Sequence, residues 1–138
     1  MNINYWLLKS EPSTWSWDNQ VKDKVAMWDG VRNYQARNNL MKMKKGDCCF
    51  FYHSVSEKSI VGIVDVVKEY YPDPTDESGK FVAIDVKAKK ALKYPVNLEK
   101  IKINKKLKDI ALIKQSRLSV MPVTNMEFNE IIKLSNIK

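Results

Sequence analysis

The sequence predicts an α+β domain built on a small, strongly bent sheet or barrel. The chain has 138 residues, a length typical of one domain with one sizeable core. Short apolar and β-branched runs bounded by turn residues predict several strands of similar length. Helix-like segments fall early and late in the chain, which favours helices packed at the ends of the sheet. The sequence contains no repeat or linker, so we expect a single domain over residues 1–138.

The N-terminal part opens with a predicted strand at Asn4–Lys9, which ends at a serine, a glutamate and a proline. Ser13 is a candidate N-cap for a short helix that contains Trp15 and Trp17. Two tryptophans this close together are typical of core packing, and a binding platform is the alternative. Residues 21–27 are expected to link this helix to the next part of the chain.

The stretch Trp28–Asn38 is expected to carry the functional site. A turn at Gly30 opens it, and a helix follows. On a helical projection, Asn33 and Arg37 lie between two apolar edges of one face. Because buried polar groups cost stability unless they find partners, this placement indicates side chains that point into a pocket. The other amide side chains of this helix are expected to be solvated: Gln35, Asn38 and Asn39.

The rest of the chain alternates between predicted strands, loops and short helices. The helix after Gly30 is expected to end near Lys44–Gly46, where basic residues precede a glycine. Strands are predicted at 47–54, 60–68 and 81–88, with a surface loop at 71–79 before the last of them. A short helix capped by Asn97 follows, and then a segment at 107–114 that is either helix or strand. The chain continues with an extended segment at 118–123 and a C-terminal amphipathic helix that has a Thr124–Glu127 capping box.

The positive charge of the chain is concentrated in one segment. The formal net charge is +8, and residues 87–114 contain ten lysines against two acidic residues. Such a segment suits a polyanion, through phosphate contacts and counterion release. A solvated lysine-rich face is the alternative. If the partner is a nucleic acid, the candidate phosphate contacts in this segment are Lys89, Lys90, Lys105 and Lys106.

The sequence lacks the signals of membrane insertion and secretion. No apolar run approaches the ~18 residues that span a bilayer. The N-terminus has neither a basic region nor an apolar region of a signal peptide. We therefore expect an intracellular, cytoplasmic protein without a membrane partner.

The sequence also carries no recognisable metal, cofactor or catalytic motif. Cys48 and Cys49 are adjacent, which is too close for a relaxed disulfide, and we expect small buried thiols. Together with the sole histidine, His53, they are too few for a four-ligand zinc site. The sequence has no glycine-rich phosphate loop and no nucleophile elbow. We expect no cofactor, and we assign no catalytic residue.

The side chains available for binding share a chemistry. Three offer planar faces (Trp28, Tyr34, Tyr52), three offer amide edges (Asn33, Gln35, Gln115) and two offer guanidinium forks (Arg37, Arg117). Reading an extruded nucleobase needs this mixture of aromatic stacking and hydrogen bonds to the base edge. A polar network inside the core is the alternative.

Four blocks of the sequence resemble the EVE domain family: YWLLKSEP at 5–12, WDGVRNYQARN at 28–38, FYHS at 51–54 and QSRLSVMPV at 115–123. They occur in the order of the family, and the resemblance extends over about residues 4–132. The family includes bacterial stand-alone proteins and a nuclear protein of animals. The resemblance implies a PUA-like fold, a curved, barrel-like mixed β-sheet with helices packed around it. It also implies a reader that holds a flipped, modified base of DNA or RNA in a pocket.

The resemblance further implies which residues form the walls of this nucleobase pocket. They are Lys9, Ser10 and Glu11 at the end of the first strand, then Trp28, Asn33, Tyr34 and Arg37, then His53 and Ser54, and finally Arg117, Ser119 and Val120. The lysine-rich run at 102–108 departs from the pattern of the family.

The leading hypothesis is therefore a non-enzymatic domain that binds nucleic acid and reads a modified base. An enzyme of the PUA-like or ASCH type, acting on a nucleoside or RNA with His53 or Lys9 as acid or base, is the alternative. A protein-interaction module that works through the lysine-rich segment is a third option. A chain of this size supplies no effector domain, so an effector protein would be a separate partner.

Overall fold

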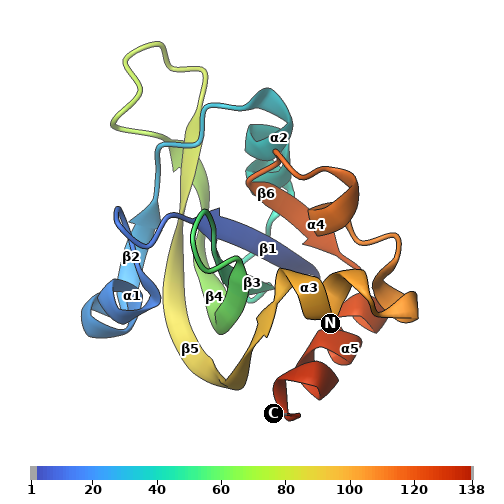
Figure 1. Cartoon of the computed structure of the whole chain (residues 1–138). Coiled ribbons are helices and arrows are strands. Elements are labelled where there is room, and N and C mark those ends of the chain that lie inside the picture. Colours follow the sequence, from blue (N-terminus) through green and yellow to red (C-terminus); the bar gives the residue numbers. More distant parts are fainter. Residues whose placement is uncertain (1–2, 138) are drawn as a thin grey trace.

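Six strands form one mixed sheet in the computed structural model of the chain, which describes residues 3–137 (Figure 1). The strands are β1 (Tyr5–Ser10), β2 (Val25–Trp28), β3 (Cys48–His53), β4 (Ser59–Pro72), β5 (Val82–Asn97) and β6 (Val120–Val123). Their order is β2-β5-β4-β3-β1-β6; β1 and β3 are parallel, and the other neighbours are antiparallel. The sheet is open, and it curves where β4 and β5 shift register several times. The predicted α+β class and curved sheet are confirmed.

The helices cover the ends and one side of this sheet. They are α1 (Trp17–Asp23), α2 (Tyr34–Lys42), α3 (Leu98–Lys102), the 3-10 turn η1 (Lys105–Leu107), α4 (Ala111–Lys114) and α5 (Asn125–Ser135). In Figure 1, α1 lies beside β2, α2 and α4 lie beside β6, and α3 and α5 lie together at the opposite end from α2. None of the helices between residues 3 and 137 has the length and apolar character that crossing a membrane requires.

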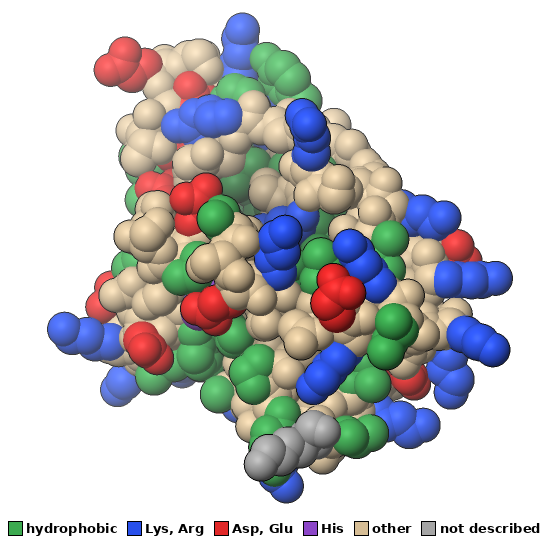
Figure 2. All heavy atoms as spheres, in the orientation of Figure 1, with side chains coloured by type: hydrophobic (Ala, Val, Ile, Leu, Met, Phe, Trp, Pro, Cys, Tyr) green, Lys and Arg blue, Asp and Glu red, His purple; other side chains and the backbone are tan. Residues whose placement is uncertain are grey.

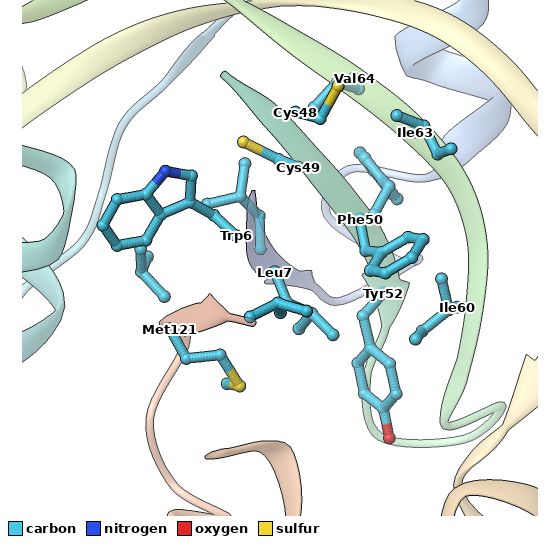
Figure 3. Packing of buried hydrophobic residues seen from close by; sticks show 14 of the residues in the cluster. Trp6, Leu7, Cys48, Cys49, Phe50, Tyr52, Ile60, Ile63, Val64 and Met121 are labelled. Carbon is cyan, nitrogen blue, oxygen red and sulfur yellow. The ribbon is translucent and has the colours of Figure 1, made fainter. Parts of the chain in front are cut away.

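The core is built around β3, whose six residues are all buried. Neighbouring residues of a strand point to opposite faces, so Phe50 and Phe51 fill both sides of the sheet. Phe50 stacks on Phe128 of α5 with ring centroids 4.7 Å apart. Phe51 lies edge-on to Trp17 at 5.3 Å and to Trp28 at 5.5 Å. Figure 3 shows the packing of β1, β3 and β4 side chains in this core.

The two cysteines lie in the same core and are not bonded to each other. Cys48 and Cys49 are both free and buried, so the prediction of small buried thiols is confirmed. Burial raises the pKa of both thiols, and it does so most for Cys49, whose side chain is fully enclosed. These thiols are therefore packing groups.

The first helix begins later than Ser13, and the predicted cap is wrong. Ser16 is the N-cap: its hydroxyl accepts from the Asn19 backbone N–H at 3.1 Å, and the Asn19 side chain accepts from the Ser16 backbone at 2.9 Å. This reciprocal pair satisfies two free N–H groups of the first turn. Trp15 consequently lies outside the helix and Trp17 opens it.

The expected link at 21–27 is also wrong, because it contains the end of α1 and most of β2. The four residues of β2 are too few to show a period of two, and they pair with β5 from Val25 opposite Lys87 to Trp28 opposite Ile84. Tertiary pairing therefore makes this strand. The partner β5 continues to Asn97, well beyond the predicted end at residue 88, because β4 pairs with it along its length.

The strand β4 likewise runs past residue 68, into the predicted surface loop. Asp73, at the start of that loop, is 2% exposed. Other predicted elements are confirmed: Asn97 caps α3, and Thr124 and Glu127 form the capping box of α5. The ambiguous segment 107–114 contains the end of η1 and the short helix α4.

Candidate functional site

A cavity of about 930 Å³ opens where β1 ends and β2 begins its turn toward α2. Four segments line it: the end of β1 with the loop that follows, the end of α1, β2 with the turn after it, and the residue before β6. The lining residues are Lys9, Ser10, Glu11, Thr14, Trp15, Asp23, Val25, Ala26, Met27, Trp28, Asp29, Gly30, Val31, Arg32, Asn33 and Ser119.

Lys9 joins two walls of this cavity. Its backbone N–H donates to the Ser119 carbonyl at 2.9 Å, which continues the pairing of β1 with β6. Its ammonium donates to the Ser116 carbonyl at 2.7 Å and lies 5.9 Å from the centre of the Tyr52 ring. Burial lowers the pKa of Lys9, and burial raises the pKa of Tyr52 to about 12. A half-buried cation is thus held at the cavity wall.

Trp15 presents a half-buried aromatic ring to the cavity. Its indole N–H donates to the side-chain oxygen of Gln20 at 3.0 Å, and its carbonyl accepts from the Ser10 hydroxyl. Gln20 is fully buried and donates in turn to the carbonyls of Lys24 and Val86. The ring is therefore fixed by a buried amide that belongs to the core.

The neighbouring Trp17 belongs to the core, as predicted. Its ring occupies the space beside Gly62 of β4, where an added Cβ would lie 2.5 Å from ring carbons. Its backbone N–H donates to His53 Nε2 at 2.9 Å, so the ring proton of His53 is on Nδ1, 3.1 Å from Glu57 Oε2. Trp17 is therefore a core residue and is not part of the cavity lining.

The turn after β2 is tied to the loop between β4 and β5 by one carboxylate. Asp73 accepts from the backbone N–H of Gly30 at 2.9 Å, from Arg32 Nη1 at 3.0 Å, and from the Thr75 backbone and hydroxyl at 2.7 and 2.6 Å. Burial acts to raise the pKa of Asp73, but these hydrogen bonds outweigh it and lower the pKa to about 2. Gly30 has a φ of +77°, a conformation that suits glycine. The turn that carries Trp28 is thereby fixed.

The polar groups of the cavity include both donors and acceptors. Lys9 and Arg32 supply cations, and Glu11, Asp23 and Asp29 supply exposed carboxylates. Within residues 3–137, no group of three His, Cys, Asp or Glu side chains is arranged to hold a metal ion. Together with the indole rings, these groups suit a planar ligand that has hydrogen-bonding edges.

The structure brings together six of the twelve residues predicted for the pocket, namely Lys9, Ser10, Glu11, Trp28, Asn33 and Ser119. The other six do not line the cavity. His53 is buried against Trp17, Ser54 donates its backbone N–H to the Ser10 carbonyl at 2.9 Å, and Val120 is fully buried. Arg117 is exposed, and Tyr34 and Arg37 lie on the outer side of α2, away from the lining.

The polar residues of α2 do not face as predicted, since the helix starts at Tyr34 and Asn33 therefore lies outside the projected face. Asn33 is its N-cap, with a side-chain oxygen that accepts from the Ala36 N–H at 2.9 Å. Arg37 donates to Asn38 and to the Lys80 carbonyl at the surface. Asn39 was expected to be solvated, but it is 8% exposed and donates to the Val120 carbonyl at 2.7 Å. Asn39 is thus the inward amide of this helix.

The predicted phosphate contacts lie away from the cavity lining. Lys89 of β5 approaches Asp65 at 3.8 Å, and Lys106 of η1 approaches Glu130 of α5 at 3.8 Å. Many Lys and Arg side chains gather on the right of Figure 2, over α3, η1, α4 and α5.

The sequence-based prediction of pocket residues does not include Trp15, Asp29 and Arg32, which line the cavity. A capping-box reading of Ser16 and Asn19 would have placed Trp15 outside the helix.

Comparison with known proteins gives consistent matches over nearly the whole chain. Residues 4–134 match the EVE domain family. Thymocyte nuclear protein 1 of Mus musculus is 36% identical over 165 residues, which covers 95% of this chain and 73% of that protein. An NMR structure of a protein from Rhodopseudomonas palustris superposes with a TM-score of 0.92 at 50% identity and covers 98% of this chain and 94% of that one. The crystal structure of human THYN1 protein in complex with 5-methylcytosine-containing DNA has a TM-score of 0.87 at 34% identity, covering 98% and 99% of the two chains.

Proposed function

Because this chain belongs to the EVE domain family, we propose that it binds nucleic acid and reads a modified base held in the cavity beside β1 and β2. The human relative that was crystallised with 5-methylcytosine-containing DNA supports this proposal and makes a 5-modified cytosine the first candidate. A base inside a duplex cannot reach a cavity of this kind, so the modified nucleotide is extruded or is read in a single strand.

The fixed ring of Trp15 at the cavity wall is the observation that carries the proposal. Trp15 is half-buried, its indole N–H is bonded to Gln20, and it shares the cavity with Trp28. An aromatic ring held in this way offers a stacking surface without losing much side-chain entropy on binding. The cavity volume of about 930 Å³ is within the range of small-molecule sites, about 300–1,000 Å³, and a nucleobase with its sugar is accommodated.

The polar lining provides for recognition of the base edge. A carboxylate accepts from the exocyclic amino group of cytosine, a role open to Glu11 or Asp29. Lys9 and Ser119 also line the cavity, and the Lys9 ammonium can donate to base or sugar oxygens. The apolar side chains of β2, Val25 and Met27, offer contact to a methyl group. We propose these residues as the reading set, with Ser10, Trp28 and Asn33 completing the walls.

The proposed role is binding without a chemical step. His53, the alternative acid or base, is outside the cavity lining and has both ring nitrogens engaged, by the Trp17 N–H and by Glu57. His53 is not free to exchange a proton with a ligand unless these contacts are broken, which favours the reader over an enzyme that uses His53.

The test is a comparison of affinities for matched oligonucleotides that differ at one base. Anisotropy titrations use DNA and RNA, single-stranded and duplex, with either cytosine or 5-methylcytosine at the centre. We expect tighter binding of one modified probe, and a rise in 2-aminopurine fluorescence beside the modified base if it is extruded. Equal affinity across every pair, extended to a panel of other modified bases, would overturn the proposal.

A further inference from the structure

Four planar side chains form a continuous stack that begins at Arg32, in the lining of the cavity, and continues away from it. The Arg37 guanidinium lies 4.9 Å from the centre of the Tyr34 ring, and Tyr34 stacks on Phe81 at 5.1 Å with planes 26° apart. Arg32 covers Phe81 at 5.5 Å. The ladder Arg37–Tyr34–Phe81–Arg32 joins α2 to the end of the loop between β4 and β5, which are neighbours at the top of Figure 1.

Hydrogen bonds hold both terminal guanidinium groups of the ladder. Arg37 donates through Nε and Nη2 to the Asn38 side chain at 3.1 and 2.8 Å, and through Nη1 to the Lys80 carbonyl at 3.1 Å. Arg32 donates to Asp73 and Thr75, at 3.0 Å each. A stacked and bonded guanidinium loses little conformational freedom when it binds an anion. Both arginines are therefore pre-positioned.

The two ends of the ladder differ in charge. Arg32 is neutralised by its ion pair with Asp73, whereas no carboxylate in residues 3–137 lies within ion-pairing distance of Arg37. Arg37 has five N–H groups, and its three hydrogen bonds leave two of them available. Lys80, beside it, is exposed. The outer end thus carries net positive charge with free donors.

The ladder is also continuous with the cavity. Arg32 lines the cavity, and the ladder leads from it to Tyr34, which is 52% exposed although it is a large aromatic residue. The faces of the Tyr34 ring are taken by Phe81 and Arg37, so a base cannot stack there without displacing a neighbour. The exposed groups of the ladder suit a backbone better than a base.

We propose that the Arg37–Tyr34–Phe81–Arg32 ladder is the docking track for the nucleic-acid strand that leaves the cavity, with a phosphate of a flanking nucleotide on Arg37. Guanidinium forks match phosphate oxygens in charge and geometry. This inference rests on the proposed function, because the nucleic-acid strand on the ladder is the one whose modified base occupies the cavity. Phosphate contacts then come from α2 and the β4–β5 loop, which lie outside the segment in which the sequence concentrates its positive charge.

The test separates a ligand that has a flanking phosphate from one that lacks it. Arg37→Ala is titrated with an oligonucleotide carrying one 5-methylcytosine and with 5-methylcytidine as a free nucleoside. We expect the oligonucleotide to bind roughly five- to tenfold more weakly at 0.1 M salt, with a salt slope smaller by about one, because one phosphate contact is lost. The affinity for the nucleoside stays that of the wild type.

Three further variants complete the test. Lys102→Ala removes the same charge from α3, outside the cavity lining, and is expected to leave both affinities close to wild type. Arg37→Gln keeps a polar side chain with the same first three carbons and removes the charge and the guanidinium fork, so it tests these two features if Arg37→Ala unfolds. Arg37→Lys retains charge without the fork and is expected to recover part of the oligonucleotide affinity.

The outcomes distinguish the ladder from the proposed function. Unchanged oligonucleotide affinity and salt slope in folded Arg37→Gln would overturn the proposed role of the ladder. The proposal that the cavity reads a modified base would still hold. Loss of nucleoside affinity in folded Arg37→Gln would also overturn it, because Arg37 would then act in the cavity. If the wild-type protein does not discriminate modified from unmodified probes, the proposed recognition of a modified base is wrong. A weaker complex of Arg37→Gln with the oligonucleotide would then still support the ladder as a contact for nucleic acid.

Discussion

The cavity and the lysine-rich segment 87–114 differ in how their polar side chains are held. Asp73, which holds the turn that lines the cavity, is buried and accepts four hydrogen bonds at 2.6–3.0 Å. In the lysine-rich segment, Lys106 and Lys114 approach their carboxylates at 3.8 and 3.9 Å, and both lysine side chains are more than 60% exposed. Fixed partners give a site its geometry, whereas mobile surface charges give long-range attraction. Net charge therefore does not locate a site with fixed geometry.

The largest expected difference between the two regions is in stability. Asp73→Ala leaves the Gly30 and Thr75 N–H groups and Arg32 without their acceptor, and we expect the free energy of unfolding to fall by about 1–3 kcal/mol. Asp109→Ala, the matched change in the lysine-rich segment, removes an exposed pair and should cost no more than about 1 kcal/mol. Urea unfolding followed by circular dichroism measures both. Equal losses of unfolding free energy in the two variants would show that the polar contacts of the two regions contribute equally to stability.

The next difference concerns binding. Trp15→Ala removes the fixed ring of the cavity, and we expect a loss of about 1–3 kcal/mol, or roughly 5- to 150-fold in Kd, for the modified oligonucleotide. Tyr94→Ala removes a half-buried aromatic from β5 in the lysine-rich segment and serves as the control. Anisotropy titration compares them after circular dichroism shows that each is folded. A Trp15→Ala variant that binds like wild type would move the site away from this cavity.

A third difference appears on acidification. The folded-state pKa of Asp73 is about 2, below its ordinary value of 3.8, so ionised Asp73 stabilises the fold above about pH 4. This contribution is lost as the pH falls from about 4 towards 2. We expect the melting temperature of wild type to drop more steeply across this window than that of Asp73→Asn. Parallel curves would mean that Asp73 does not hold the turn through its charge.

The smallest effect is expected on the discrimination between modified and unmodified oligonucleotides when lysines of the lysine-rich segment are removed. The combined variant Lys89→Ala, Lys90→Ala, Lys105→Ala and Lys106→Ala should weaken modified and unmodified oligonucleotides by the same factor. The salt slope should fall by about one for each lysine that contacts phosphate. The ratio of the two affinities should stay that of wild type. A changed ratio would place part of the reading in the lysine-rich segment.

The sequence predicted those parts of the fold that depend on near neighbours. Asn97 and the Thr124–Glu127 pair act on N–H groups within three residues of themselves, and both caps are present. A buried strand at 48–53 follows from its apolar composition. The error at Ser13 is of the same local kind, because Ser16 with Asn19 offered a better cap and was overlooked.

The strand β2 could not be predicted in this way. Its four residues have no distinctive period, and their conformation comes from pairing with β5, about 60 positions along the chain. The facing of α2 also differs from the prediction. Asn33 precedes the helix as its N-cap, and Asn39 lies inward because it is three residues after Ala36 and four before Met43, both of which are buried.

The sequence by itself determined the class of fold, the family and the concentration of positive charge in residues 87–114, since these rest on composition, local caps and blocks of contiguous residues. Only the tertiary structure decided which polar groups meet at the cavity. Lys9 reaches the Ser116 carbonyl across 107 positions, and Gly30 reaches Asp73 across 43. Such contacts depend on how strands and loops are placed relative to one another, and no local pattern encodes that placement.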